Sequence, residues 1–157
     1  MKITLLVIGK TNEGYLREGI SMYVNRLQHY VGFDYKELPD VRNAKTLPYE
    51  QLKIQEGALI LRQLSPNDDV LLLDEHGQQF SSEEWAAYLG KKMCTATKSI
   101  VFVIGGAFGF AANVMQRANG CISLSHMTFS HQMVRLIFTE QLYRAFTIIK
   151  GEPYHHT

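Results

Sequence analysis

Cysteine is scarce in this chain of 157 residues, which holds only Cys94 and Cys121. The two form no CxxC pair and have no zinc-type spacing, so the sequence offers neither a disulfide framework nor a structural zinc site, and we predict no bound metal. A chain with so few cysteines suits a reducing compartment.

Long hydrophobic runs are missing as well. The opening segment 2–8 is apolar, but it is too short for the core of a signal peptide, and no small-residue cleavage site follows it. No stretch approaches the roughly 18 apolar residues of a membrane-spanning helix. We therefore expect a cytoplasmic protein.

Neither sign of charge is in excess, because the formal net charge is +1 and charged residues make up 20% of the chain. This balance neither indicates nor excludes a nucleic-acid partner, since a positive surface would have to be local or assembled from two subunits. The length fits one domain, residues 1–157, and 46% hydrophobic residues are enough to fill its core.

Short apolar runs alternate with segments of helical spacing. The runs 70–73 and 100–104 are apolar throughout, which is typical of strands buried on both faces of a parallel sheet. We predict an α/β fold with a largely parallel sheet flanked by helices. Asn12 is expected to cap the first helix, and Ser81 with Glu84 matches a capping box. The expected strands are 2–8, 33–38, 70–73, 100–104 and 121–124, and the expected helices are 13–30, 48–64, 82–93, 112–118 and 131–149.

Three glycines, Gly105, Gly106 and Gly109, follow strand 100–104. Glycines at the carboxyl end of a parallel strand let a ligand approach the backbone closely. The spacing is not GxGxxG and no Walker-type lysine follows, which disfavours an ordinary dinucleotide or triphosphate site. The same residues also suit a plain strand-to-helix turn, so the pattern alone leaves both interpretations open.

Residues 121–130 mix small, hydroxylated and apolar side chains without a clear period. Such a loop could surround an adenine, with Leu124, Met127 or Phe129 as its walls. The alternative is a strand end followed by Ser130 as the cap of the last helix.

The last predicted helix is apolar on more than one face, since ten of the sixteen residues from 134 to 149 are hydrophobic. A second apolar face indicates a subunit interface.

Glu140 and Arg144 lie four residues apart and form either a helix-stabilising ion pair or part of a site. The tail after the helix, which ends in Pro-Tyr-His-His-Thr, is either frayed or folded back over the site.

Together these segments resemble the ribosomal RNA large subunit methyltransferase H family of the SPOUT superfamily. The resemblance covers essentially the whole chain and rests on KITLLVIGK, VLLLDEHG, VFVIGGAFGF, LSHMTFSHQMVR, EQLYRAF and the terminal PYHH. It implies a homodimer and a deep C-terminal trefoil knot that holds S-adenosylmethionine bent, largely through backbone groups. Ser130 departs from the family's usual proline, so we expect the site to be retained with a more mobile loop. The implied cofactor contacts are Leu73, Gly105, Leu124, Ser125, His126, Met127, Thr128 and Phe129.

The reaction that this resemblance implies is methylation at N3 of a pseudouridine in a hairpin loop of 23S ribosomal RNA. The proton on N3 must leave before N3 can attack a methyl group. We expect His155 to act as base or proton relay. Arg144 would stabilise a developing oxyanion or bind phosphate, and Tyr154 would stack on or orient the base. His131 and Arg135 are expected to line the RNA groove.

Two other functions compete with this one. A non-catalytic factor that binds ribosomal RNA during ribosome assembly would keep the fold, and RNA binding without affinity for S-adenosylmethionine would favour it. A flavodoxin-like module for a nucleotide or flavin is also a small parallel α/β fold, but the missing phosphate loop weighs against it.

Overall fold

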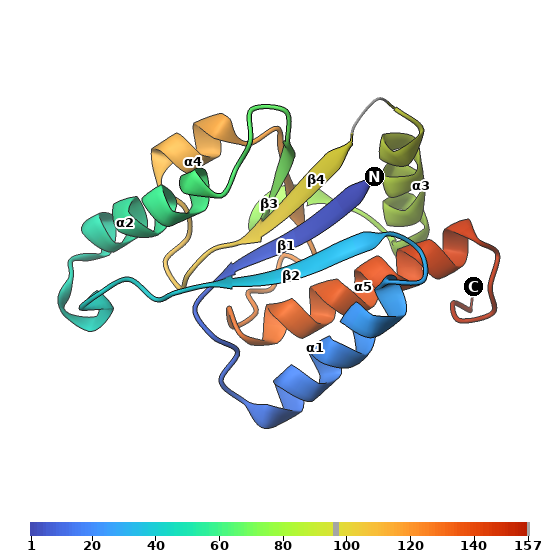
Figure 1. Ribbon diagram of the computed structural model, residues 1–157, viewed down its shortest axis with the longest axis horizontal. Coiled ribbons are helices and arrows are strands. Elements are labelled where there is room, and N and C mark those ends of the chain that lie inside the picture. The colour runs from blue at the N-terminus through green and yellow to red at the C-terminus, as the bar shows by residue number, and fades with distance from the viewer. Residues whose placement is uncertain (96–97, 157) are drawn as a thin grey trace.

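In the computed structural model, which describes residues 1–95 and 98–156, five parallel strands form one sheet (Figure 1). Their order across the sheet is β2-β1-β4-β3-β5, and each pair of neighbours runs parallel. The parallel sheet confirms the predicted α/β fold class. The strands are β1 (Lys2–Ile8), β2 (Gly32–Leu38), β3 (Asp69–Gln79), β4 (Ser99–Ile104) and β5 (Gly120–Ser123).

Helices cover both faces of this sheet (Figure 1). Helix α5 packs between α1 and α3 on one face, and α2 packs with α4 on the other. None of the described helices has the length and hydropathy needed to cross a membrane. The helices are α1 (Gly14–Leu27), α2 (Tyr49–Arg62), α3 (Ser82–Cys94), α4 (Ala112–Arg117) and α5 (Met133–Ile149), and a short 3-10 turn, η1 (Ala44–Thr46), precedes α2.

The central strands are buried on both sides because their side chains alternate between two apolar layers. In β1, Ile3, Leu5 and Val7 belong to the layer that includes residues of α3 and α5, whereas Leu6 and Ile8 belong to the layer against α2 and α4. An uninterrupted apolar run is therefore what a central parallel strand requires.

Strand β3 is longer than the sequence predicts. Its pairing with β5 breaks after Leu73 and resumes at Gln78, so the strand continues past a bulge to Gln79. Gly77 permits this arrangement, because a Cβ atom there would lie 2.6 Å from the backbone nitrogen of Ile122. The bulge leaves residues 74–77 out of the pairing with β5 at the carboxyl end of the sheet, where ligands bind in parallel α/β folds.

The predicted caps have mixed outcomes. The hydroxyl of Ser81 accepts a hydrogen bond from the Glu84 amide at 3.1 Å, which confirms that cap of α3. The prediction for Asn12 is wrong, because α1 begins after Glu13 and has no side-chain cap. Helix α5 starts at Met133, two residues later than expected, after a turn that includes the residues of the candidate site.

Candidate active site

A cavity of about 700 Å³ opens at the carboxyl end of the sheet. Three segments form most of its wall: residues 73–76 of β3, residues 104–110 at the end of β4 and after it, and residues 124–131 between β5 and α5, of which 126 alone does not contribute. Met115 of α4 and Val134 of α5 complete the wall. Its volume falls in the range of small-molecule sites. The two stretches that the sequence singled out, 105–106 and 124–129, are thus brought to one place by the sheet.

The turn after β4 presents backbone to the cavity. Gly105 and Gly106 carry no side chain there, and Gly109 has a φ of +88°, which favours glycine over any other residue. A Cβ atom at Gly105 would lie 3.0 Å from the ring of Phe110, so a larger side chain at that position has to displace the ring or extend into the cavity. The turn therefore suits a ligand that contacts main chain.

Side-chain hydroxyls fix the shape of the segment between β5 and α5. Ser123 donates to the carbonyl of Ser125 at 2.8 Å, and the Ser125 hydroxyl accepts from the Met127 amide at 3.0 Å. The Ser130 hydroxyl accepts from the amide of Met133, the first residue of α5, at 3.0 Å, which agrees with the alternative interpretation of Ser130, although Gln132 is the residue that directly precedes the helix. Each of these serines thus forms a hydrogen bond with a backbone group of the loop or of the first residue of α5.

Most of the predicted cofactor contacts meet at this cavity, although their binding roles stay predictions. His126 is the exception, because it is not among the residues that form the wall. His131, which we expected in an RNA groove, lies on the cavity wall, and its role stays a prediction. The predicted residues on the wall are Leu73, Gly105, Leu124, Ser125, Met127, Thr128 and Phe129.

Sequence reasoning missed the acidic part of the wall. Asp74 and Glu75 follow the buried run of β3 and line the cavity with His76, whose ring nitrogen lies 2.9 Å from the Asp74 carboxylate. Their position directly after a buried strand could have identified them, because ligands bind at the carboxyl ends of parallel strands. Burial lowers the pKa of His131 and the nearby Arg135 charge lowers it further, which favours the neutral imidazole.

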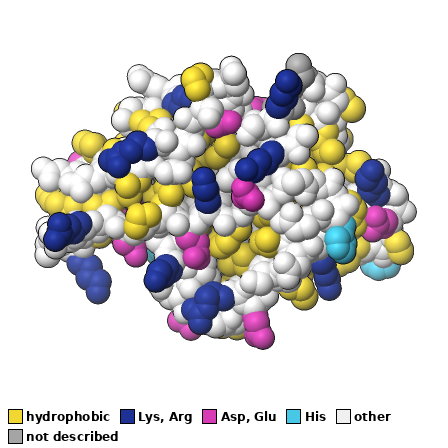
Figure 2. Space-filling model, in the orientation of Figure 1, with side chains coloured by type: hydrophobic (Ala, Val, Ile, Leu, Met, Phe, Trp, Pro, Cys, Tyr) yellow, Lys and Arg dark blue, Asp and Glu magenta, His cyan; other side chains and the backbone are white. Residues whose placement is uncertain are grey.

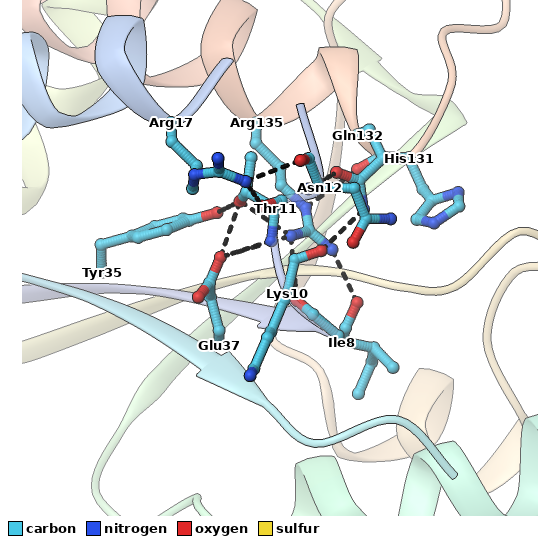
Figure 3. A network of polar contacts seen from close by, with 11 residues as sticks. Ile8, Lys10, Thr11, Asn12, Arg17, Tyr35, Glu37, His131, Gln132 and Arg135 are labelled. Atoms are coloured by element: carbon cyan, nitrogen blue, oxygen red, sulfur yellow. Dashed lines mark hydrogen bonds and ion pairs between the residues drawn. The ribbon is translucent and has the colours of Figure 1, made fainter. Parts of the chain in front are cut away.

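The prediction that Arg135 lines an RNA groove is wrong, because its side chain is fully buried. The guanidinium donates to the carbonyl oxygens of Ile8 at 2.6 Å and Gly9 at 2.9 Å, and to the Thr11 hydroxyl at 3.0 Å. Figure 3 shows Arg135 among Ile8, Thr11 and Glu37. The Glu37 carboxylate lies 3.7 Å away. Arg135 thus fastens the start of α5 to the end of β1 and is not available to RNA.

The predicted catalytic side chains form a separate cluster at the other end of α5. Arg144 donates to Glu140 at 2.5 Å and contacts Nδ1 of His155 at 2.9 Å. The other ring nitrogen of His155 lies 2.9 Å from Glu83, and Arg144 stacks over the Tyr154 ring at 4.8 Å. The tail is therefore folded onto α5 and not frayed, and the Glu140–Arg144 pair is part of a larger network.

This tail cluster lies away from the cavity of its own chain. Val134 lines the cavity and Arg144 comes ten residues later, which corresponds to about 15 Å along the helix axis. The structure thus brings Arg144, Tyr154 and His155 together but does not place them on the cavity wall within one chain.

Comparison with known proteins decides the family. The sequence model of the family described as "Predicted SPOUT methyltransferase" matches residues 1–155. The chain belongs to this family. Its curated relatives named "Ribosomal RNA large subunit methyltransferase H" include those of Parabacteroides distasonis and Christiangramia forsetii, each 54% identical, and of Porphyromonas gingivalis, 53% identical. Each match covers 99% of both chains.

A SPOUT methyltransferase needs a methyl donor, and the cavity suits one of moderate size. The glycine turn supplies backbone, residues 124–129 supply apolar and hydroxyl groups, and Asp74 and Glu75 supply negative charge. A cationic donor is therefore favoured at this wall over an anionic one, because carboxylates attract positive charge in a partly enclosed site.

Glu56 of α2 is an unpaired carboxyl group behind the glycine turn of this methyltransferase. It is 8% exposed, its Oε1 has no hydrogen-bond partner within the described part of the chain, and a Cβ atom at Gly106 would collide with it. Burial raises its pKa, and the Asp40 charge raises it further. The native state therefore favours the protonated form, and this stabilisation is lost as the pH rises from the unfolded pKa through the folded one.

We expect Glu56→Gln to raise the free energy of unfolding at pH 8 by about 1 kcal/mol, because the neutral amide removes a buried unpaired charge. The gain should shrink to nothing near pH 4, where the wild-type carboxyl is protonated. Urea denaturation at both pH values measures it, with exposed Glu50→Gln on the same helix as the control. Equal or lower stability of Glu56→Gln at pH 8 would contradict the assignment.

Proposed function

We propose that this SPOUT methyltransferase binds S-adenosylmethionine in the cavity and methylates N3 of a pseudouridine in large-subunit ribosomal RNA, in the cytoplasm. The names of its relatives, about 50% identical over the whole chain, support the ribosomal RNA substrate. The observation that carries the proposal is the meeting of the glycine turn 105–106 with residues 124–129 around one cavity.

Bound S-adenosylmethionine supplies an electrophilic methyl group on a positively charged sulfur. Main-chain groups of Gly105 and of residues 124–129 orient the ligand, and Leu73 adds an apolar contact. Asp74 and Glu75 complement its positive charge. Alignment of the donor with N3 in this cavity would supply much of the rate, since displacement needs alignment more than a strong catalyst.

The tail cluster supplies the groups that the acceptor base requires. Burial raises the pKa of Tyr154 well above its ordinary value, so its phenol keeps its proton and acts as a donor. The hydrogen bond to Glu140 raises the pKa of Arg144, which stays charged and can stabilise negative charge on the uracil ring. The imidazole of His155 has one ring nitrogen against Arg144 and the other against Glu83, so it is held beside both charged groups.

A homodimer resolves the separation between the tail cluster and the cavity. The cavity lies at the start of α5 and the cluster near its end, so antiparallel pairing of α5 about a two-fold axis would bring the cluster of one copy to the cavity of the other. The partly exposed apolar residues Met133, Ile137 and Ile148 support an α5 interface.

We further propose that the chain forms the trefoil knot of its superfamily. The segment 124–131 leaves the edge strand β5 and passes the loops after β3 and β4 before α5 begins under the end of β1, where Arg135 binds. Connections that cross at one edge of a sheet are avoided in ordinary folds, and threading of this segment accounts for the crossing.

Transfer of a labelled methyl group from S-adenosylmethionine to large ribosomal subunits that lack the modification tests this function. We expect label on 23S ribosomal RNA, at N3 of a single pseudouridine after digestion to nucleosides. Stoichiometric RNA binding without affinity for S-adenosylmethionine would overturn the proposal in favour of an assembly factor.

A further inference from the structure

Two exposed aromatic rings stack on each other beside the cavity. The ring centroids of Tyr49 and Phe108 lie 3.9 Å apart with an angle of 20° between the ring planes. Tyr49 is nevertheless 63% exposed and Phe108 44% exposed. Burial therefore does not account for the pair, which presents aromatic surface to solvent.

The aromatic pair is continuous with the candidate active site. Phe108 belongs to the turn after β4 and lines the cavity, and Tyr49 is the first residue of α2. Met115 and Met127 also line the cavity and are 48% and 77% exposed. A molecule whose reactive atom enters the cavity can thus place a neighbouring group on the aromatic pair.

The segment that leads into Tyr49 carries positive charge. Arg42 and Lys45 are exposed, and neither has an ion-pair partner among the residues that the structure describes. Of the acids nearest to Tyr49 along the chain, Glu50 pairs with Lys53 at 3.1 Å, the carboxylate of Asp40 lies against the backbone of Gly9, and Glu56 is buried. Figure 2 shows Lys and Arg side chains around hydrophobic ones at the left end, where α2 begins in Figure 1.

We propose that Tyr49 and Phe108 form a stacking platform for a nucleobase that neighbours the methylated one, and that Arg42 and Lys45 bind the adjoining phosphates. This inference rests on the proposed function. Splayed bases of an RNA loop stack on aromatic side chains, and cations that track the backbone accompany such platforms. Unpaired cations beside exposed rings favour this occupant over the apolar face of a second protein copy.

Tyr49→Ala tests the platform, because Tyr49 does not line the cavity. We expect its KM for large ribosomal subunits to rise on the order of tenfold, with kcat, affinity for S-adenosylmethionine and dimer mass unchanged. Tyr49→Phe keeps the ring and should restore the KM. Tyr15→Ala on α1, whose tyrosine is 60% exposed, is the matched control and should behave like the wild type.

Binding of the same subunits, measured by cosedimentation at increasing salt, separates this inference from the proposed function. The double variant Arg42→Gln/Lys45→Gln should show weaker binding and a shallower salt dependence than the wild type, whether or not methyl transfer occurs. Unchanged RNA affinity of Tyr49→Ala would overturn the platform, and so would loss of the dimer in that variant, which would assign the pair to a subunit interface.

Discussion

Arg135→Met is expected to lower the free energy of unfolding by about 3–5 kcal/mol, the largest stability effect that the structure predicts for a single side chain outside the apolar core. The wild-type guanidinium satisfies the carbonyl oxygens of Ile8 and Gly9 and faces Glu37. Methionine fills part of the same volume but leaves these buried acceptors without donors. Equilibrium urea denaturation measures the loss.

Two further variants show whether the hydrogen bonds of Arg135 are responsible. Arg135→Lys should recover only a small part of the loss, because an ammonium group cannot reach acceptors that surround a planar guanidinium. Arg17→Met, which removes an exposed arginine that donates to the carbonyls of Thr11 and Asn12, should cost less than about 1 kcal/mol. A loss below about 1 kcal/mol for Arg135→Met would contradict the anchoring role.

Arg144→Ala should remove nearly all methyl transfer while leaving the affinity for S-adenosylmethionine unchanged, since Arg144 lies about 15 Å along α5 from the cavity of its own chain. Gly105→Trp should lower the affinity for S-adenosylmethionine, and methyl transfer with it, because an indole at the glycine turn would occupy the cavity. Mixed dimers of the two variants then show whether an active site contains parts of two chains.

In a shared-site dimer, one site of each mixed dimer combines the intact cavity of the Arg144→Ala chain with the intact tail of the Gly105→Trp chain. Each mixed dimer has one intact site of two, so isolated mixed dimers should show about half of wild-type activity, and a random mixture, in which about half of the dimers are mixed, should show about a quarter. Coexpression with two affinity tags isolates these dimers for the methyl transfer assay. If their activity stays at the level of the parents, the tail cluster does not act across the interface.

Much of the fold followed from hydrophobic pattern. The runs in β1, β3 and β4 specify central parallel strands because no other common element is apolar on both faces over so short a length. The extension of β3 past Leu73 was not predictable, because the pairing of Gln78 and Gln79 with β5 depends on a bulge. The polar residues of this segment give no sequence signal for a bulge. The end of α1 and the start of α5 each differ from expectation by two or three residues, as helix ends often do.

The sequence predicted the part of the candidate site that consists mainly of backbone groups. Glycines after a buried strand point to the carboxyl edge whatever the surrounding fold, so Gly105 was identified correctly as a cavity residue. Arg135 was misplaced because a charged residue on a helix usually faces solvent, and its buried acceptors come from β1, more than a hundred residues away in sequence. No local pattern reveals such a pairing.

The distance between the tail cluster and the cavity could likewise not be predicted from the sequence. His155 and Arg144 lie close to Val134 along the chain, and only the straight path of α5 shows that the helix carries them away from the cavity. Whether these side chains act in the site of their own chain or in that of a second copy depends on the geometry of the dimer. Hydrophobic periodicity indicates an interface but not its geometry.

A crystal structure of the protein with S-adenosylmethionine most directly tests the claim on which this account rests. It should show the adenosine and sulfonium groups enclosed by Gly105–Gly106 on one side and residues 124–129 on the other, with the methyl carbon facing the tail of a second copy. Density for the ligand anywhere else on the molecule, with this cavity filled by water alone, would contradict the account.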